Sequence, residues 1–402
     1  MPGVRRSEML RSMITCRTEA IISNTAREGM LLEPRDIGWD AARRAFNLAV
    51  DQRPALVALP LDDRDVVDAV LAARSRGLRI VAQSRGHRAA PVLDDAMLLR
   101  TTALADVEID ARAHRARVRA GARWADVIDR ASLMGLAPAA GFSRTAGVVG
   151  DLVGNGMGWL ARSHGVAARS VTAVEFVTAD GEQARVDGDM DVPAGSVITA
   201  VELALHPADD LYAGALFFSF DRADEVLHAW RDWTATAPAE ITSIARVMRF
   251  ADRDDIPEMV RGRSYTVVEA AHLGTDAALL EPLRALRPEL DTCSFVPPSA
   301  LGHLHMDFEH PEARLADDGL VGELPAAAID DLLAVAGVGG PKSQSPLTTV
   351  ELRHASGALE TLERGFFTHA AGTPTDAASA AAIEAQLALV AGALAPYGAV
   401  TL

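Results

Sequence analysis

The 402-residue chain has little positive charge and almost no lysine. Lys+Arg total 39 against 55 Asp+Glu, the net charge is -16, and Lys342 is the only lysine. Proteins that bind nucleic acid or anionic membrane surfaces need dense positive charge. We therefore expect neither nucleic acid nor a membrane among its partners.

Cysteine and long apolar runs are also scarce. Cys16 and Cys293 are the only two cysteines, too few for a disulfide framework or a cysteine zinc cluster. The first 27 residues mix charges throughout and lack the apolar centre of a signal peptide. No uninterrupted apolar run approaches the roughly 18 residues of a membrane span. With 49% hydrophobic and 23% charged residues, the composition predicts a globular protein located in the cytoplasm.

The length favours two domains, and the element order shows where they divide. Strands are predicted at residues 55–61 and 78–84, with a helix over 61–77 between them. This order predicts a right-handed unit in which the two strands pair in parallel. The other elements predicted before Pro207 are a helix at 40–50, strands at 97–100, 107–110 and 116–120, a helix at 124–134, a hairpin at 170–186 and a strand at 196–205.

Beyond Pro207 the pattern predicts an α+β domain, an antiparallel sheet with helices on one face. Its predicted strands are 213–220, 241–250, 264–271 and 347–354, and its predicted helices are 222–236, 276–286 and 376–395. We therefore divide the chain into an extension (1–38), a first domain (39–207) and a second domain (208–402).

Two segments of the first domain are candidates for ligand binding. Ser84-Arg85-Gly86-His87-Arg88 follows a predicted parallel strand, where α/β proteins place ligands, although a surface turn would have the same sequence. Residues 147–158 carry five glycines, too many for an ordinary helix or strand. They match neither a P-loop nor the Rossmann spacing. By themselves they indicate either close packing against a flat or phosphorylated ligand, or a set of tight turns.

Taken together, these motifs resemble a known family. The SRGHR loop, the segment from Gly156 to Gly165 (GMGWLARSHG) and the hairpin VTADG (177–181) are similar to the FAD-binding domain of the vanillyl-alcohol oxidase and p-cresol methylhydroxylase superfamily. The bacterial berberine-bridge-enzyme-like branch is the most similar. The resemblance implies an α+β fold, with a two-subdomain FAD-binding domain (PCMH-type) followed by a substrate domain.

The resemblance also assigns roles to residues. The loop matching Ser84–Arg88 wraps the FAD pyrophosphate, and a histidine at the position of His87 is often bound covalently to the flavin. Ser143 matches a cysteine that forms a second covalent link in some relatives, so at most one link is implied here. The remaining cofactor-binding positions implied by the match are Thr145, Gly147, Gly150, Gly154 and Val197.

The chain departs from the family at several positions. Arg85 replaces a glycine, and Asp151 and Asn155 interrupt the glycine-rich pattern. A longer glycine-rich segment of the relatives is missing between Gly188 and Ser196. The chain ends about where relatives enter a further C-terminal segment, so we expect that segment to be absent, and a truncated gene product would explain this.

Candidates for the catalytic base lie on one predicted strand. Glu351 and Arg353 should share one of its faces, and His354 the other. Glu351 and His354 are the two candidates, although a lone histidine is more often structural. His303, His305 and Asp307 do not complete a metal ligand set, so no metal is expected.

The leading hypothesis is an FAD-dependent oxidoreductase, an oxidase or dehydrogenase. It would remove hydride from a small organic substrate such as an alcohol, a sugar or a secondary metabolite, and pass electrons to oxygen or another acceptor. The alternative hypothesis is a degenerate, non-catalytic relative that binds a ligand on the same fold.

Overall fold

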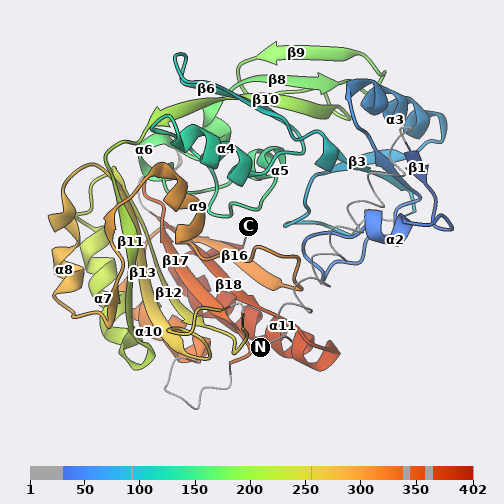
Figure 1. The fold of residues 1–402 in the computed structure, drawn as a ribbon. Coiled ribbons are helices and arrows are strands. Elements are labelled where there is room, and N and C mark those ends of the chain that lie inside the picture. The colour runs from blue at the N-terminus through green and yellow to red at the C-terminus, as the bar shows by residue number, and fades with distance from the viewer. Residues whose placement is uncertain (1–29, 92–93, 255, 338–344, 358–364, 402) are drawn as a thin grey trace, which may run out of the picture.

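The computed structural model describes residues 30–91, 94–254, 256–337, 345–357 and 365–401. Cys16 and most of the predicted extension lie outside these residues. The predicted boundary near Pro207 falls between two strands that belong to different sheets. Figure 1 shows the earlier part of the chain in blue and green and the later part in yellow to red.

A four-stranded sheet begins the first domain, in the order β1 (Met30–Leu32), β2 (Leu56–Leu59), β4 (Ala96–Arg100) and β3 (Arg79–Gln83). Both β2 and β3 run parallel to β4, but they do not pair with each other. The predicted direct pairing is therefore wrong. Met97, Leu98 and Leu99 are fully buried, and a strand covered on both faces belongs at the centre of a sheet.

The helix α3 (Asp63–Ser75) confirms the predicted crossover between β2 and β3. The Asp62 carboxylate accepts hydrogen bonds from the backbone N–H groups of Arg64 and Asp65 and so caps its start. Gly77 ends the segment at φ +65°, a conformation that favours glycine.

The predicted helix at 40–50 is wrong, because only α2 (Trp39–Ala42) is helical. The next residues pair with the candidate loop after β3. The N–H groups of Phe46 and Asn47 donate to the carbonyls of Arg85 and Gly86, at 2.9 and 3.2 Å. These long-range hydrogen bonds replace the local helical ones, which the sequence pattern could not anticipate.

A second sheet completes the first domain and confirms the predicted strands and hairpin. Its strands are β5 (Val107–Asp110), β6 (Arg115–Arg119), β10 (Val197–Pro207), β8 (Val171–Val177) and β9 (Gln183–Asp187), with β7 (Leu136–Pro138) paired to β10. The helices beside it are α4 (Trp124–Ser132), α5 (Val148–Val153) and α6 (Ala161–His164). The core between them is built mainly from valines, alanines and Trp124.

The second domain is built on one antiparallel sheet in the order β14-β11-β13-β12-β17-β18-β16-β19. Its strands are β11 (Leu211–Ser219), β12 (Ile241–Arg249), β13 (Ser264–Leu273), β14 (Leu290–Asp291), β15 (Ser294–Phe295, paired to β11), β16 (Leu315–Val321), β17 (Thr349–His354), β18 (Phe366–Gly372) and β19 (Val400–Thr401). The expected antiparallel sheet is confirmed. The strands of this sheet that were not predicted are β16 and β18 and the two-residue strands β14, β15 and β19.

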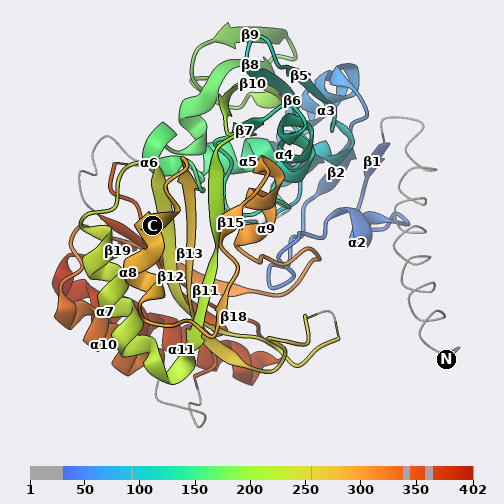
Figure 2. The same ribbon diagram turned by 60° about the vertical axis from the view of Figure 1, so that its left-hand side comes forward.

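The main helices of this domain cover the face of the sheet that points away from the first domain (Figures 1 and 2). They are α7 (Ala223–Thr234), α8 (Glu281–Arg284), α10 (Ala326–Ala336) and α11 (Ala377–Leu394), while α9 (Leu301–Leu304) lies near the first domain. Single 3-10 turns occur at η1 (Thr101–Ala103), η2 (Ala167–Ser170), η3 (Phe220–Arg222), η4 (Ala277–Leu280), η5 (Pro298–Ala300) and η6 (Ala395–Tyr397).

One helical stretch, Ala377–Tyr397, is long and apolar enough to cross a membrane by length and composition alone. Its mean hydropathy is 1.6, and 22% of it is buried. Ile383, Leu387, Val390 and Leu394 pack into the core of the second domain. Because core helices of water-soluble proteins pass the same test, this stretch is weak evidence for a membrane span.

Candidate active site

The predicted cofactor loop, Ser84–Arg88, lies at the C-terminal end of β3, where it contacts the glycine-rich segment. Gly86 adopts φ +82°, which a residue with a side chain rarely takes. At Gly147 a Cβ atom would lie 2.2 Å from the Ser84 Oγ, so the two segments touch only because Gly147 has no side chain. The structure thus brings together two motifs that are 60 residues apart in the sequence.

His87 is held between aromatic and hydroxyl partners. Its ring stacks on Phe46 with 3.8 Å between ring centroids, and its Nε2 lies 3.1 Å from the Thr145 Oγ1. Burial lowers the pKa of His87 to about 4. The ring is therefore neutral near pH 7 and keeps one nitrogen with a free lone pair, as a bond to an electrophilic carbon would require.

The glycine-rich segment contains a buried carboxyl group. Asp151 on α5 accepts hydrogen bonds from the Trp124 Nε1 at 2.8 Å and from the Gly141 backbone N–H at 3.1 Å. Burial raises the pKa of Asp151 to about 6, although these donors oppose the shift. Asp151 thus fixes the loop that continues into Phe142.

The other predicted positions are more scattered. Gly150 lies on α5 with open space beside it, and Gly154 ends that helix. The Val197 side chain packs in the core beside Leu56 and Met97, so only its backbone could contact a ligand. Arg88 turns toward the second domain, where its Nη2 lies 2.9 Å from the Asp318 carboxylate.

The sequence did not single out Arg100, at the end of β4. Burial, together with the nearby positive charge of Arg85, lowers the pKa of Arg100 to about 10. Its Nη1 donates to the Arg44 carbonyl at 3.0 Å. The positive charges of Arg85 and Arg100 thus repel each other at the carboxyl edge of the parallel sheet. A bound anion would relieve this repulsion.

Across from these loops, the second domain presents a row of ionisable side chains. Asp318, His369, Glu351 and Arg246 lie directly opposite one another on β16, β18, β17 and β12. Their neighbours along the strands, such as Val350, pack under the helices on the opposite face. The row therefore belongs to the face that meets the first domain.

Glu351 is paired with two arginines. Its carboxylate lies 2.7 Å from the Arg353 guanidinium and 3.4 Å from that of Arg246. Burial would raise the pKa of Glu351, but Arg353 and the other cations hold it well below its usual value. Glu351 is therefore ionised near pH 7, as a base must be, although its paired arginines weaken its basicity.

The predicted His303, His305 and Asp307 cluster is divided. His303 is exposed, whereas His305 is buried with its Nδ1 3.0 Å from Glu269 and its Nε2 3.5 Å from Glu351. Arg246 pairs with Glu269 as well. His305 thus belongs to a buried ion-pair cluster rather than to a metal ligand set with His303.

Glu351 and His354 are not brought together. His354 stacks on Phe366 with 5.6 Å between ring centroids, on the other face of β17, and burial lowers its pKa to about 3. Nearby, Arg162 of the first domain donates hydrogen bonds to the carbonyls of Ala237, Pro238, Ile241 and Ser356. His354 therefore lies among structural contacts between the domains.

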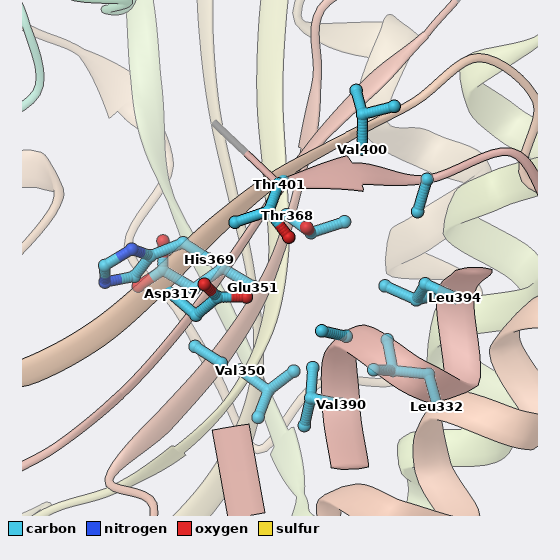
Figure 3. Close-up of a pocket in the computed structure, with 14 residues that line it drawn as sticks. Asp317, Leu332, Val350, Glu351, Thr368, His369, Val390, Leu394, Val400 and Thr401 are labelled. Carbon is cyan, nitrogen blue, oxygen red and sulfur yellow. The ribbon is translucent and has the colours of Figure 1, made fainter. Parts of the chain in front are cut away.

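Instead, the structure places His369 beside Glu351. The His369 Nδ1 lies 2.7 Å from the Asp318 carboxylate and its Nε2 lies 3.0 Å from the Arg314 Nη2. The side chain points away from Val390 and Leu394, which line one side of a hollow beside α11 (Figure 3). Sequence reasoning missed His369 because β16 and β18 were not predicted.

The residues present fit FAD. The buried Ser84 Oγ has no hydrogen-bond partner among the described residues, and it faces the space beside Gly147 where a side chain would clash. Arg85 and Arg100 supply positive charge at the same sheet edge. An unpartnered hydroxyl, a glycine cradle and two cations together suit a diphosphate group.

Comparison with known proteins agrees with this fit. Residues 54–187 match the family model of an FAD binding domain. (R)-6-hydroxynicotine oxidase from Paenarthrobacter nicotinovorans is 30% identical over 157 residues, which is 39% of this chain and 34% of that protein. The region of this chain that aligns therefore spans about a third of the length of this relative.

Solved structures show the same fold over nearly the whole chain. 6-hydroxy-D-nicotine oxidase from Arthrobacter nicotinovorans has a TM-score of 0.75 at 22% identity, covering 93% of this chain and 87% of its own. Phl p 4, a grass pollen allergen with glucose dehydrogenase activity, has a TM-score of 0.74 at 17% identity, covering 92% and 83%. The expected fold is confirmed.

Proposed function

Because residues 54–187 are an FAD-binding domain of the type found in the vanillyl-alcohol oxidase and p-cresol methylhydroxylase superfamily, we propose that this chain is an FAD-dependent oxidoreductase acting on a small organic substrate. When bound, FAD accepts a hydride from the substrate. Oxygen or another acceptor then takes the electrons. A cytoplasmic location and the absence of nucleic-acid and membrane partners stay predictions.

One observation carries the proposal. The predicted cofactor loops of the first domain face a row of ionisable groups in the second domain, and the two are joined by Arg88 and Asp318 at 2.9 Å. Arg353 also lies over the Phe142 ring, 5.0 Å from its centroid. Buried, mutually paired acids and bases that face a cofactor site are typical of catalytic sites.

The residues of this site have distinct tasks. Ser84, Arg85 and Arg100 would hold the diphosphate, and His87 would lie beside the flavin ring. Asp151 fixes the loop that leads to Phe142. Of the two candidates predicted from the sequence, Glu351 is the one on the face that meets the first domain, where it lies directly opposite His369 on the neighbouring strand.

The test begins with the visible absorbance of the purified protein after incubation with FAD and gel filtration. We expect a yellow protein that is bleached anaerobically by at least one compound from a panel of polyols, aldoses, benzylic alcohols and secondary amines. Colour that stays with the polypeptide after acid denaturation would support attachment at His87. Failure to take up FAD would overturn the proposal, and uptake without bleaching by any compound would favour the non-catalytic alternative.

A further inference from the structure

Arg314 and His369 form an unusual pair at the junction of the two domains. The Arg314 Nη2 lies 3.0 Å from the His369 Nε2, and the His369 Nδ1 lies 2.7 Å from Asp318. Arginine can only donate hydrogen bonds, so the His369 Nε2 must be the acceptor. The proton of the neutral ring is therefore on Nδ1, from which it is donated to Asp318.

This arrangement holds His369 as a neutral base. Burial lowers the pKa of His369, although the hydrogen bond to Asp318 opposes the shift. Burial would raise the pKa of Asp318, but the hydrogen bond from His369 and the nearby arginines hold it at about 2. An ionised aspartate that orients a neutral imidazole leaves the opposite nitrogen available to accept a proton.

The Arg314 backbone is held by Asn47, whereas its side chain has no carboxylate partner within the described parts of the chain. The Asn47 side chain accepts from the Arg314 N–H at 3.0 Å and donates to its carbonyl at 2.9 Å. Among the described residues no carboxylate lies within 4.0 Å of the guanidinium, which rests over the Phe308 ring at 5.2 Å. A ligand hydroxyl that binds between Arg314 and His369 would exchange their direct hydrogen bond for one hydrogen bond to each side chain.

A donor beside an acceptor is complementary to one kind of substrate group. A neutral hydroxyl can accept from Arg314 and donate to His369 at the same time. A carboxylate would pair with Arg314 but has no proton for His369, and an ammonium group would be repelled by Arg314. The pair therefore selects a hydroxyl.

Resting on the proposed oxidoreductase function, we propose that the substrate is an alcohol whose hydroxyl binds between Arg314 and His369. His369 takes the hydroxyl proton on Nε2, and the adjacent C–H bond breaks with its electron pair leaving as hydride to the bound FAD. The alcohol is oxidised by two electrons to a carbonyl compound while FAD is reduced. Asp318 stabilises the imidazolium that forms.

The other charged groups around His369 are consistent with a neutral substrate. Glu351 and Arg353 on β17 pair with each other, and Arg88 pairs with Asp318. Burial would raise the pKa of Asp307, but the nearby His305 and Arg314 lower it, so Arg314 also has a counter-charge close by. Opposite charges are thus matched before substrate binds. A substrate with a net charge would have to be buried without a counter-charge, which is costly.

Three small fluorinated probes test the selection without turnover. Trifluoroethanol, trifluoroacetate and trifluoroethylammonium present a hydroxyl, a carboxylate and an ammonium group on the same scaffold. Fluorine NMR line broadening reports their binding to the FAD-loaded protein. We expect trifluoroethanol to bind, and its affinity to fall about fivefold in Arg314→Met and in His369→Asn, as expected for the loss of one hydrogen bond.

The two variants also separate the two contacts. His369→Asn keeps a donor for Asp318 but removes the accepting Nε2, so trifluoroacetate binding should weaken only in Arg314→Met. His228→Asn is the matched control, because His228 pairs with Asp330 at 2.8 Å on the outer helices. Its binding of all three probes should equal that of the unmodified protein.

Equal trifluoroethanol binding in the protein, Arg314→Met and His369→Asn would overturn the inference, as would tighter binding of trifluoroethylammonium than of trifluoroethanol. The FAD affinity and circular dichroism of each variant show whether it is folded. If only one of the two variants folds, its trifluoroethanol affinity is sufficient for the test. Failure of FAD uptake would instead overturn the proposed function. Bleaching by an amine but by no alcohol would leave the oxidoreductase function intact and overturn only this inference.

Discussion

The two domains contribute different kinds of groups to the junction between them. The first domain contributes glycines, hydroxyl groups and backbone from two loops, whereas the second contributes side chains with full charges. Ser84 packs against Gly147 because the glycine has no side chain. Glu351 and Arg353 are instead held together by their opposite charges. The first arrangement suits a cofactor held by shape and backbone, and the second suits the binding and deprotonation of a substrate.

The largest effect is expected from breaking the charge balance of the second domain. Arg246→Met leaves Glu269 and Glu351 without their shared cation and should cost about 3–5 kcal/mol of unfolding free energy. Leu352→Ala, a cavity on the opposite, apolar face, should cost a similar 2–5 kcal/mol. Chemical denaturation across pH distinguishes them: only the Arg246→Met loss should shrink on acidification, because protonation neutralises the two carboxylates. A pH-independent loss in both variants would contradict the contrast between the two faces.

A somewhat smaller effect is expected from Asp151 in the first domain. Burial raises the folded pKa of Asp151 to about 6, above the ordinary value of an aspartate. Its contribution to stability is therefore present below about pH 4 and lost as the pH rises through 6, by up to about 3 kcal/mol. Asp151→Asn keeps an acceptor for Trp124 and Gly141 and should remove this pH dependence. Thermal melts of both proteins from pH 4 to 7 that remain parallel would disprove this assignment.

Cofactor affinity tests the first domain's cationic edge. Arg100→Met should weaken FAD binding about 10–100-fold, the loss of one or two charge-assisted hydrogen bonds. Riboflavin binding should stay unchanged because riboflavin lacks the phosphates. Arg74→Gln, at an exposed ion pair with Asp180, is the control. Fluorescence titration measures the binding of FAD and of riboflavin to Arg100→Met, and the binding of FAD to Arg74→Gln. Equal weakening of riboflavin binding would show that Arg100 acts on the fold of the site and not on the phosphates.

The smallest effect is expected for His354. His354→Gln should change the rate of flavin reduction by less than about threefold, because its ring lies among structural contacts. Glu351→Gln should slow it by about 100-fold or more, because it removes the carboxylate that offsets Arg353 and Arg246 beside His369. Anaerobic stopped-flow mixing with an active compound from the panel measures both rates. A large loss in His354→Gln with unchanged melting temperature would restore it as a catalytic candidate.

Much of the fold followed from local pattern. The strands of the second sheet other than the short β7, the capped helix after β2 and the hairpin turned at Gly181 were all predicted. Each depends on short-range periodicity and on a residue that favours a turn. The position of β4 between β2 and β3 was not, since pairing order depends on burial that no local window contains. Residues 40–50 failed for the same reason, because their hydrogen bonds lie across the chain.

The site shows the same division. Ser84–Arg88, Thr145 and Gly147 were found through contiguous motifs, and the structure brings them together. His369 and Asp318 do not belong to any recognisable motif. The strand LADDGLV contains two aspartates and a glycine, residues that are typical of loops. Their meeting depends on the register of β16 against β18.

By itself, the sequence determined the match to an FAD-binding domain, the α+β class of the second domain and the two loops that the structure brings together, because glycines and turns act locally. Only the tertiary structure decided which ionisable groups meet. Strand register set Asp318, His369, Glu351 and Arg246 in one row. The pairing of β16 with β18 brought Arg314 to His369, and Asn47 of the first domain holds the Arg314 backbone there. Contacts between residues far apart in sequence are fixed by the packing of whole sheets, which no short pattern encodes.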